Sequence, residues 1–156
     1  MRIALQANLV RGLVGRMSVM PPASSEPVRL RMSRQRRRDT RPELLIRRLL
    51  HSRGIRYRVN TRPAPGLRCN PDIAWRGLRL AVFVDGCFWH SCPQHATRPK
   101  ANEEWWAQKL VRNVKRDRRI DEELKAHGWT VLRFWEHEEP VSVADAICKK
   151  LAELRS

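Results

Sequence analysis

The feature that most constrains the fold is a nearly uninterrupted apolar run at residues 80–84 (LAVFV), directly before Asp85. A strand that is apolar at every position is buried on both faces, so it belongs in the interior of a sheet. Residues 72–75 precede it, and a turn signal at residues 76–77 (RG) separates the two segments. This pattern predicts a hairpin with a central second strand, and it brings Asp72 and Asp85 to the same end of the sheet.

The other elements follow from hydrophobic periodicity and from turn residues. A helix is expected from Thr40 to Arg53, opened by a capping box between Thr40 and Glu43 and stopped by Gly54. Apolar and polar residues alternate over 55–59 and predict a strand. Three more elements complete the order αβββαβα, a mixed α/β sandwich: a long helix from Asn102 to His127 capped by Gly128, a strand over 129–135, and a helix from Val143 to Leu154.

The chain of 156 residues, with 42% hydrophobic residues, is long enough for one domain with a modest core. Residues 21–27 (PPASSEP) are typical of a flexible linker, and an arginine-rich stretch follows them. We therefore expect a variable N-terminal extension over residues 1–31 and one catalytic domain over residues 32–156.

The net charge of +16 and the pI near 11.3 indicate a polyanionic partner. Basic charge suits nucleic acid and acidic membranes alike, but no stretch approaches the roughly 20 apolar residues of a membrane span. Nucleic acid is the favoured partner, and a membrane is not. The four cysteines are too sparse for a disulfide scaffold, so we expect the protein in the reducing cytoplasm. We also expect a monomer that is associated with the nucleoid.

Cysteine and histidine residues cluster directly after the central strand. Cys87, Cys92 and His95 lie within nine residues, and His137 follows the last predicted strand. Two Cys and two His can complete a tetrahedral zinc site, and a closed ligand set of this kind makes the zinc structural. The alternative is a pair of buried free thiols beside two solvent-exposed histidines.

The residues at the end of the predicted hairpin suit phosphodiester hydrolysis. Asp72 and Asp85 offer oxygen ligands to a hard cation, for which Mg²⁺ is the natural candidate. His90 could act there as a general acid or base, or serve instead as a spare zinc ligand. Glu43 could bind the metal from the first helix, although its place in the capping box already accounts for it.

Four blocks of the sequence carry a family resemblance: residues 39–43 (DTRPE), 71–73 (PDI), 82–90 (VFVDGCFWH) and 112–118 (RNVKRDR). Over residues 32–140 the chain resembles the very-short-patch-repair (Vsr) mismatch endonucleases. The resemblance implies a restriction-endonuclease-like fold and Mg²⁺-dependent hydrolysis. It also implies nicking of double-stranded DNA on the 5′ side of the thymine in a T·G mispair, left when 5-methylcytosine deaminates. Other mismatch-repair proteins are then candidate partners.

The same resemblance implies roles for individual residues. Asp72 matches the metal-binding aspartate of the family, Glu43 its active-site glutamate, and His90 the histidine of the catalytic centre. The structural zinc of the family corresponds in position to four residues here: Cys87, Cys92, His95 and His137.

The DNA-contacting residues of the family also have counterparts. Aromatic side chains that wedge into the duplex match Phe88, Trp89 and Trp106, although Trp106 could instead be a core residue. Lys109 and Asn113 lie on one helical face and match residues that reach the mismatched bases. Met32 corresponds to a wedge from the other side.

The sequence departs from some family members at residues 84–85, where they have Thr-His. Val84 could offer only its backbone carbonyl to the ion. Asp85 is then either a second carboxylate on the metal or an acidic replacement with another task. Besides a mismatch-nicking enzyme, the sequence allows a related nuclease in restriction or defence. A non-catalytic, zinc-stapled DNA-binding module is the remaining interpretation.

Overall fold

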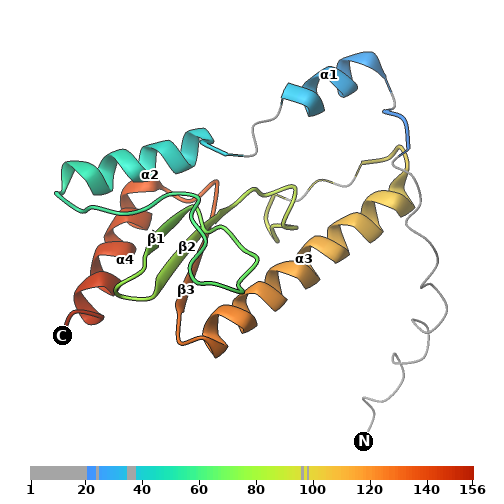
Figure 1. Ribbon diagram of the computed structural model, residues 1–156. Helices are drawn as coiled ribbons and strands as arrows, with labels where there is room; N and C mark the ends of the chain where they lie inside the picture. Colours follow the sequence, from blue (N-terminus) through green and yellow to red (C-terminus); the bar gives the residue numbers. More distant parts are fainter. Residues whose placement is uncertain (1–20, 24, 35–37, 96, 98) are drawn as a thin grey trace, which may run out of the picture.

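The computed structural model describes residues 21–23, 25–34, 38–95, 97 and 99–156, with the backbone alone for residues 31–34 (Figure 1). Helices cover both faces of a small sheet, and α1 lies apart from it. The elements, in chain order, are α1 (Glu26–Arg34), α2 (Arg41–Ser52), β1 (Ile73–Trp75), β2 (Leu80–Asp85), α3 (Glu103–Ala126), β3 (Thr130–Trp135) and α4 (Pro140–Glu153).

The sheet confirms the predicted hairpin and its central strand. β1 and β2 pair antiparallel with Ile73 opposite Val82, and β2 pairs in parallel with β3 on its other side. Five of the six residues of β2 are buried. The parallel pairing of β2 and β3 requires a long crossover connection, and α3 provides it.

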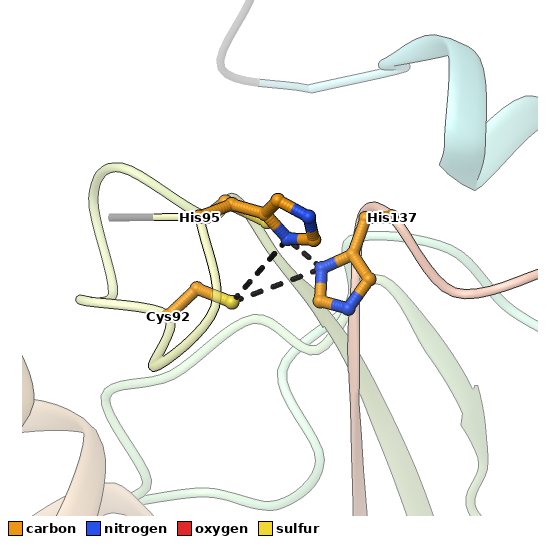
Figure 2. Close-up of side chains that lie close together, drawn as sticks. Cys92, His95 and His137 are labelled. Atoms are coloured by element: carbon orange, nitrogen blue, oxygen red, sulfur yellow. Dashed lines mark hydrogen bonds between the residues drawn. The ribbon is translucent and has the colours of Figure 1, made fainter. Parts of the chain in front are cut away.

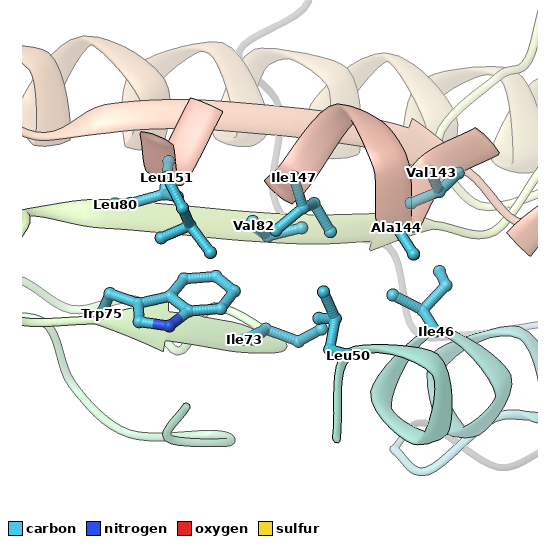
Figure 3. Close-up of a cluster of buried hydrophobic side chains, with 10 residues drawn as sticks. All are labelled: Ile46, Leu50, Ile73, Trp75, Leu80, Val82, Val143, Ala144, Ile147 and Leu151. Carbon is cyan, nitrogen blue, oxygen red and sulfur yellow. The ribbon is translucent and has the colours of Figure 1, made fainter. Parts of the chain in front are cut away.

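Alternate residues of β2 face different cores, as the two-residue period of a strand requires. Leu80 and Val82 belong to the larger cluster, which the helices α2 and α4 cover (Figure 3). Ala81 and Phe83 belong to the smaller cluster on the α3 side. Asp85 continues this second series, so its carboxylate points toward α3.

The prediction of a strand over residues 55–59 is wrong. A single β-bridge joins Arg58 to Ala74, and the described part of this segment contains no ladder. Its first residues are tied to α2 instead, through hydrogen bonds from Ile55 N to the Leu50 carbonyl and from the Tyr57 hydroxyl to the Arg47 carbonyl. The order in the described residues is therefore ααββαβα, with three strands.

The predicted helices are present, with shifted ends. α4 begins three residues before Val143, because the side chain of Glu139 accepts a hydrogen bond from Ser142 N at 2.9 Å and Pro140 is tolerated in the first turn. α3 ends at Ala126, one residue before the expected His127, and the φ of +75° at the expected cap Gly128 suits a residue without Cβ.

The N-terminal part of the chain contains a helix, α1, that the sequence did not predict. α1 begins at Glu26, so the linker predicted over residues 21–27 extends two residues too far, and the expected boundary at residue 32 falls inside this helix. Among the described helices, none is long and apolar enough to cross a membrane.

Candidate active site and metal centre

Asp72 lies at the end of the sheet where β2 stops, because antiparallel pairing brings the start of β1 to that end. Its Oδ2 accepts a hydrogen bond from Val84 N at 2.7 Å, and its carbonyl accepts one from Arg47 Nη2 at 3.4 Å. Burial raises the pKa of the Asp72 carboxyl to about 6, against the hydrogen bond from Val84, and the charges of Glu43 and Asp85 add to the increase. The end of the sheet therefore concentrates negative charge, which a cation would neutralise.

Glu43 reaches this region from the first turn of α2 and is only 3% exposed. It accepts hydrogen bonds from Asp39 N at 3.0 Å, from the Thr40 hydroxyl at 2.9 Å and from Arg47 Nη2 at 3.2 Å. The expected capping box is therefore altered: Thr40 donates to Glu43 and makes no side-chain cap of its own. These contacts hold Glu43 close enough for its charge to raise the pKa of Asp72.

Asp85 is the last residue of β2, at the same end of the sheet, and is 7% exposed. Arg133, on β3, donates to both of its oxygens, at 2.8 and 2.9 Å. The same guanidinium binds both oxygens of Asp121 on α3. Asp72 and Asp85 thus reach the same end of the sheet, as predicted, but Asp85 is already paired with a cation of the chain.

His90 is held by α3. Its Nδ1 lies 2.6 Å from Asp117 Oδ2 and 3.5 Å from Asp85 Oδ1. Burial alone would raise the pKa of Asp117, but its contacts with His90 and Arg116 outweigh burial and lower it. An open pocket of about 240 Å³ lies beside this pair, and its lining includes Asp85, His90, Asp117, Arg118 and Arg133.

The predicted metal ligands come together beyond the ends of β2 and β3. One donor atom each from Cys87, Cys92, His95 and His137 lies within 4.8 Å of the others. His137 Nδ1 is 3.1 Å from Cys87 Sγ. Figure 2 shows the other three ligands: Cys92 Sγ is 3.8 Å from His137 Nδ1 and 3.9 Å from His95 Nδ1.

These four candidate ligands, Cys87, Cys92, His95 and His137, form the metal cluster. Both of its thiols are buried, and both of its imidazoles are more exposed. Burial and the neighbouring Cys92 raise the pKa of the Cys87 thiol to about 11. A bound cation would offset this by favouring the thiolate. The donor set, two sulfurs and two nitrogens at short range, fits one tetrahedral metal ion.

The aromatic side chains beside this loop form a compact group. Phe88, Trp89 and Trp106 contact one another, and Trp105 contacts Trp106. Three of these four pairs are edge to face and one is tilted, with ring centroids 4.9 to 5.9 Å apart. Each of them is half-buried. Trp106 therefore packs on the predicted wedge residues themselves, and Trp105 is a member that the sequence did not indicate.

The predicted base-contacting residues differ in their surroundings. Asn113 is buried on α3 and donates from Nδ2 to the Trp89 carbonyl at 3.0 Å. Its amide therefore supports the loop after β2 that carries Phe88 and Trp89, the aromatic loop. Lys109 lies one turn earlier and is half-buried. The side chain of Met32 lies outside the described residues.

Sequence reasoning gave no role to Asp117, Asp121 and Arg133, which complete the pocket. Asp117 stands in the block 112–118, whose clustered charges resemble an ordinary solvated helix face. Arg133 carried the clearer signal, because it is the one charged residue in the predicted strand 129–135 (WTVLRFW).

Comparison with known proteins gives consistent matches. Residues 24–95 match the family model described as DNA mismatch endonuclease Vsr. The type II nicking enzyme V.NaeI of Lentzea aerocolonigenes is 44% identical over 125 residues, covering 79% of this chain and 75% of that protein. V.XorIIP of Xanthomonas oryzae, also named a type II nicking enzyme, is 40% identical and covers 74% of this chain and 83% of its own. The DNA mismatch endonuclease Vsr of Escherichia coli is 37% identical, with 64% and 62% covered.

Proposed function

Because the chain belongs to the Vsr family of DNA mismatch endonucleases, we propose that it nicks one strand of duplex DNA on the 5′ side of the thymine in a T·G mispair. DNA is the substrate class of this family. The observation that carries the proposal is the convergence of Asp72, Glu43 and the His90–Asp117 pair at one end of the sheet.

Asp72 is the proposed protein ligand of a catalytic Mg²⁺, with the Val84 carbonyl beside it and Glu43 acting from α2. The oxygen donors of the half-buried Asp72 and the buried Glu43 are the type that Mg²⁺ prefers. When bound, Mg²⁺ supplies positive charge to the phosphoryl oxygen as negative charge develops there. The carboxylates of Asp72 and Glu43 would hold the ion, and its charge would offset their mutual repulsion.

His90 is the proposed general base. Its Nδ1 faces Asp117 Oδ2 at 2.6 Å, which fixes the ring and leaves Nε2 for proton transfer. Nε2 accepts a proton from the attacking water, and Asp117 stabilises the imidazolium that results. A restriction-endonuclease-like assignment for the fold accords with a mixed sheet that carries acidic residues at one end.

The metal cluster is the proposed structural zinc site, and the aromatic group the proposed wedge. Zinc would tie the loop after β2, which carries Phe88 and Trp89, to His137 after β3. A loop that enters a duplex needs such support, because unstacking a base step costs about a few kcal/mol. We assign Lys109 to the DNA contact, Met32 to the opposite wedge, and Asn113 to holding the loop through Trp89.

A nicking assay tests the function. Labelled duplexes that differ only in T·G or T·A at one position are incubated with the full chain and Mg²⁺. We expect one cut, 5′ of the mispaired thymine, and at least about a 100-fold loss in Asp72→Ala. Asp145→Ala, a carboxylate on the far helix α4, is the control and should nick as the wild type does. Equal cutting of both duplexes would contradict the mismatch specificity.

A second candidate is nicking at another duplex feature, because the relatives at 44% and 40% identity are named type II nicking enzymes. Cleavage of matched duplex at a fixed sequence would favour it. The non-catalytic DNA-binding module gains no support from these relatives, since their names are those of nicking enzymes and endonucleases.

A further inference from the structure

Arg133 occupies an unusual position for an arginine, in the middle of a strand and largely enclosed. Its register partner on β2 is Phe83, and its guanidinium carbon lies 4.4 Å from the centroid of the Phe83 ring. The side chain is 21% exposed and projects toward α3, between the carboxylates of Asp85 and Asp121. Burying this cation is costly unless its partners compensate for the lost water.

The contacts of Arg133 engage all three nitrogens of its guanidinium. Nη1 donates to both oxygens of Asp85, at 2.8 and 2.9 Å. Nε donates to Asp121 at 2.9 Å, and Nη2 faces Asp121 Oδ1 at 2.9 Å and the Asp117 carbonyl at 3.5 Å. With each of its nitrogens engaged by the chain itself, Arg133 is placed to organise the pocket and not to hold a phosphate.

The same contacts decide which carboxylate pairs with His90. Two aspartates lie near its Nδ1: Asp117 Oδ2 at 2.6 Å and Asp85 Oδ1 at 3.5 Å. Both oxygens of Asp85 are engaged by Arg133, whereas Asp117 Oδ2 faces the imidazole. Without the guanidinium, Asp85 would be a buried, unpaired carboxylate within reach of both His90 and the metal ligands around Asp72.

We propose that Arg133 is a positioning residue of the catalytic pocket: by binding both oxygens of Asp85, it directs His90 to Asp117 and keeps Asp85 from acting as a metal ligand. The inference rests on the proposed role of His90. It also selects between the two interpretations of Asp85 that the sequence left open, in favour of a carboxylate with a task other than metal binding. Lysine would perform this task poorly, because a point charge lacks the planar fork that spans Asp85 and Asp121.

Nicking kinetics with three variants test this role. In Arg133→Met we expect kcat to fall about 10- to 100-fold, the effect of a displaced catalytic group, with KM within about threefold of the wild type. In Arg133→Met/Asp85→Asn the unpaired charge beside His90, that of Asp85, is removed, so kcat should recover at least about tenfold over the single variant. The kcat of Arg133→Lys should lie between those of Arg133→Met and the wild type. Arg53→Met removes an arginine paired with Asp145 on α4 and serves as the matched control, with unchanged nicking.

A readout other than activity follows the imidazole itself. In ¹⁵N-labelled full-length protein without Mg²⁺, the ring nitrogens of His90, assigned with His90→Ala, report which nitrogen donates a hydrogen bond. We expect these signals to shift in Arg133→Met and to return in the double variant. If Arg133→Met is unfolded, the folded double variant still tests the proposal through its kcat and its His90 signals.

The outcomes separate this inference from the proposed function. Nicking retained in His90→Ala would remove the proposed base and the inference together. An inactive His90→Ala combined with a double variant no better than Arg133→Met would overturn only the role of Arg133. A raised KM with unchanged kcat in Arg133→Met would instead make Arg133 a DNA-contacting residue and would also overturn it.

Discussion

The carboxyl group of Asp72 lies largely out of water, and its pKa rises to about 6, chiefly through burial. A carboxyl with a raised pKa in the folded state binds more protons folded than unfolded. Its contribution to stability is therefore fully present below about pH 4 and is lost as the pH rises through about 6. In the absence of Mg²⁺, Asp72 should destabilise the protein at neutral pH.

The variant Asp72→Asn tests this cost. The amide keeps an oxygen for Val84 N and carries no charge, so we expect the free energy of unfolding to rise by about 2 to 3 kcal/mol at pH 8 without Mg²⁺. The gain should shrink toward zero near pH 4. Urea denaturation at both pH values measures it, with Asp145→Asn, an exposed carboxylate paired with Arg53, as the control. A gain of the same size at both pH values would contradict the explanation.

Some residues of the candidate site could be predicted from the sequence, and some of their contacts could not. The candidates Asp72, Glu43 and His90 follow from residue types and from the family resemblance, and they meet at one end of the sheet. The pairing of Asp85 with Arg133 did not follow, because it depends on the parallel register of β2 and β3, which are 48 residues apart at this pair. Local spacing contains no information on that register.

At the scale of elements, the turn after α3 fixes how the chain enters β3. Gly128 has a φ of +75° and donates its N–H to the Lys125 carbonyl at 2.9 Å. We expect Gly128→Ala to lower the free energy of unfolding by about 1 to 2 kcal/mol, because a Cβ is strained in this conformation. A Cβ would also meet the tip of Arg79, which is flexible and can move.

Urea denaturation measures the effect of Gly128→Ala, and Gly77→Ala is a useful control. Gly77 lies in the turn between β1 and β2, has no positive φ, and leaves open space where the methyl group of an alanine would lie. The control substitution should change stability by less than about 0.5 kcal/mol. Equal losses in the two variants would show that the φ of Gly128 is not the cause.

Elements with strong local signals were predicted well, and the one that needed a partner was not. The run at residues 80–84 and the periodicity of α3 describe burial along a single segment, so β2 and α3 lie where expected. Residues 55–59 alternate in polarity, but a strand also needs an edge to pair with. β1 is three residues long and offers this segment a single bridge.

Across the whole molecule, the net charge of +16 contrasts with the pocket, whose lining includes three aspartates, Asp85, Asp117 and Asp121. The exposed face of α3 carries the cations Arg112, Lys115, Arg116 and Arg119, while Asp117 and Asp121 of the same helix turn toward the sheet. One helix thus offers charge to a phosphate backbone on one side and holds His90 and Arg133 on the other. Composition predicted the partner, but only the packing of α3 separates the two functions.

The metal cluster joins the loop after β2 to the segment after β3. Cys87, Cys92 and His95 lie after β2, and His137 lies after β3. We expect the purified protein to contain one zinc ion per chain by metal analysis, and Cys92→Ala to contain none. Since a structural zinc contributes its binding energy to folding, the thermal midpoint of Cys92→Ala should fall by about 5 to 10 °C or more.

Cys148→Ser is the matched control, because this half-buried cysteine on α4 lies outside the metal cluster. It should keep its zinc and nick the T·G duplex as the wild type does. Cys92→Ala should lose nicking even at temperatures where it stays folded, since the aromatic loop then lacks its anchor at His137. A Cys92→Ala protein that is zinc-free, stable and fully active would show that the aromatic loop is held by Asn113 and its own packing alone.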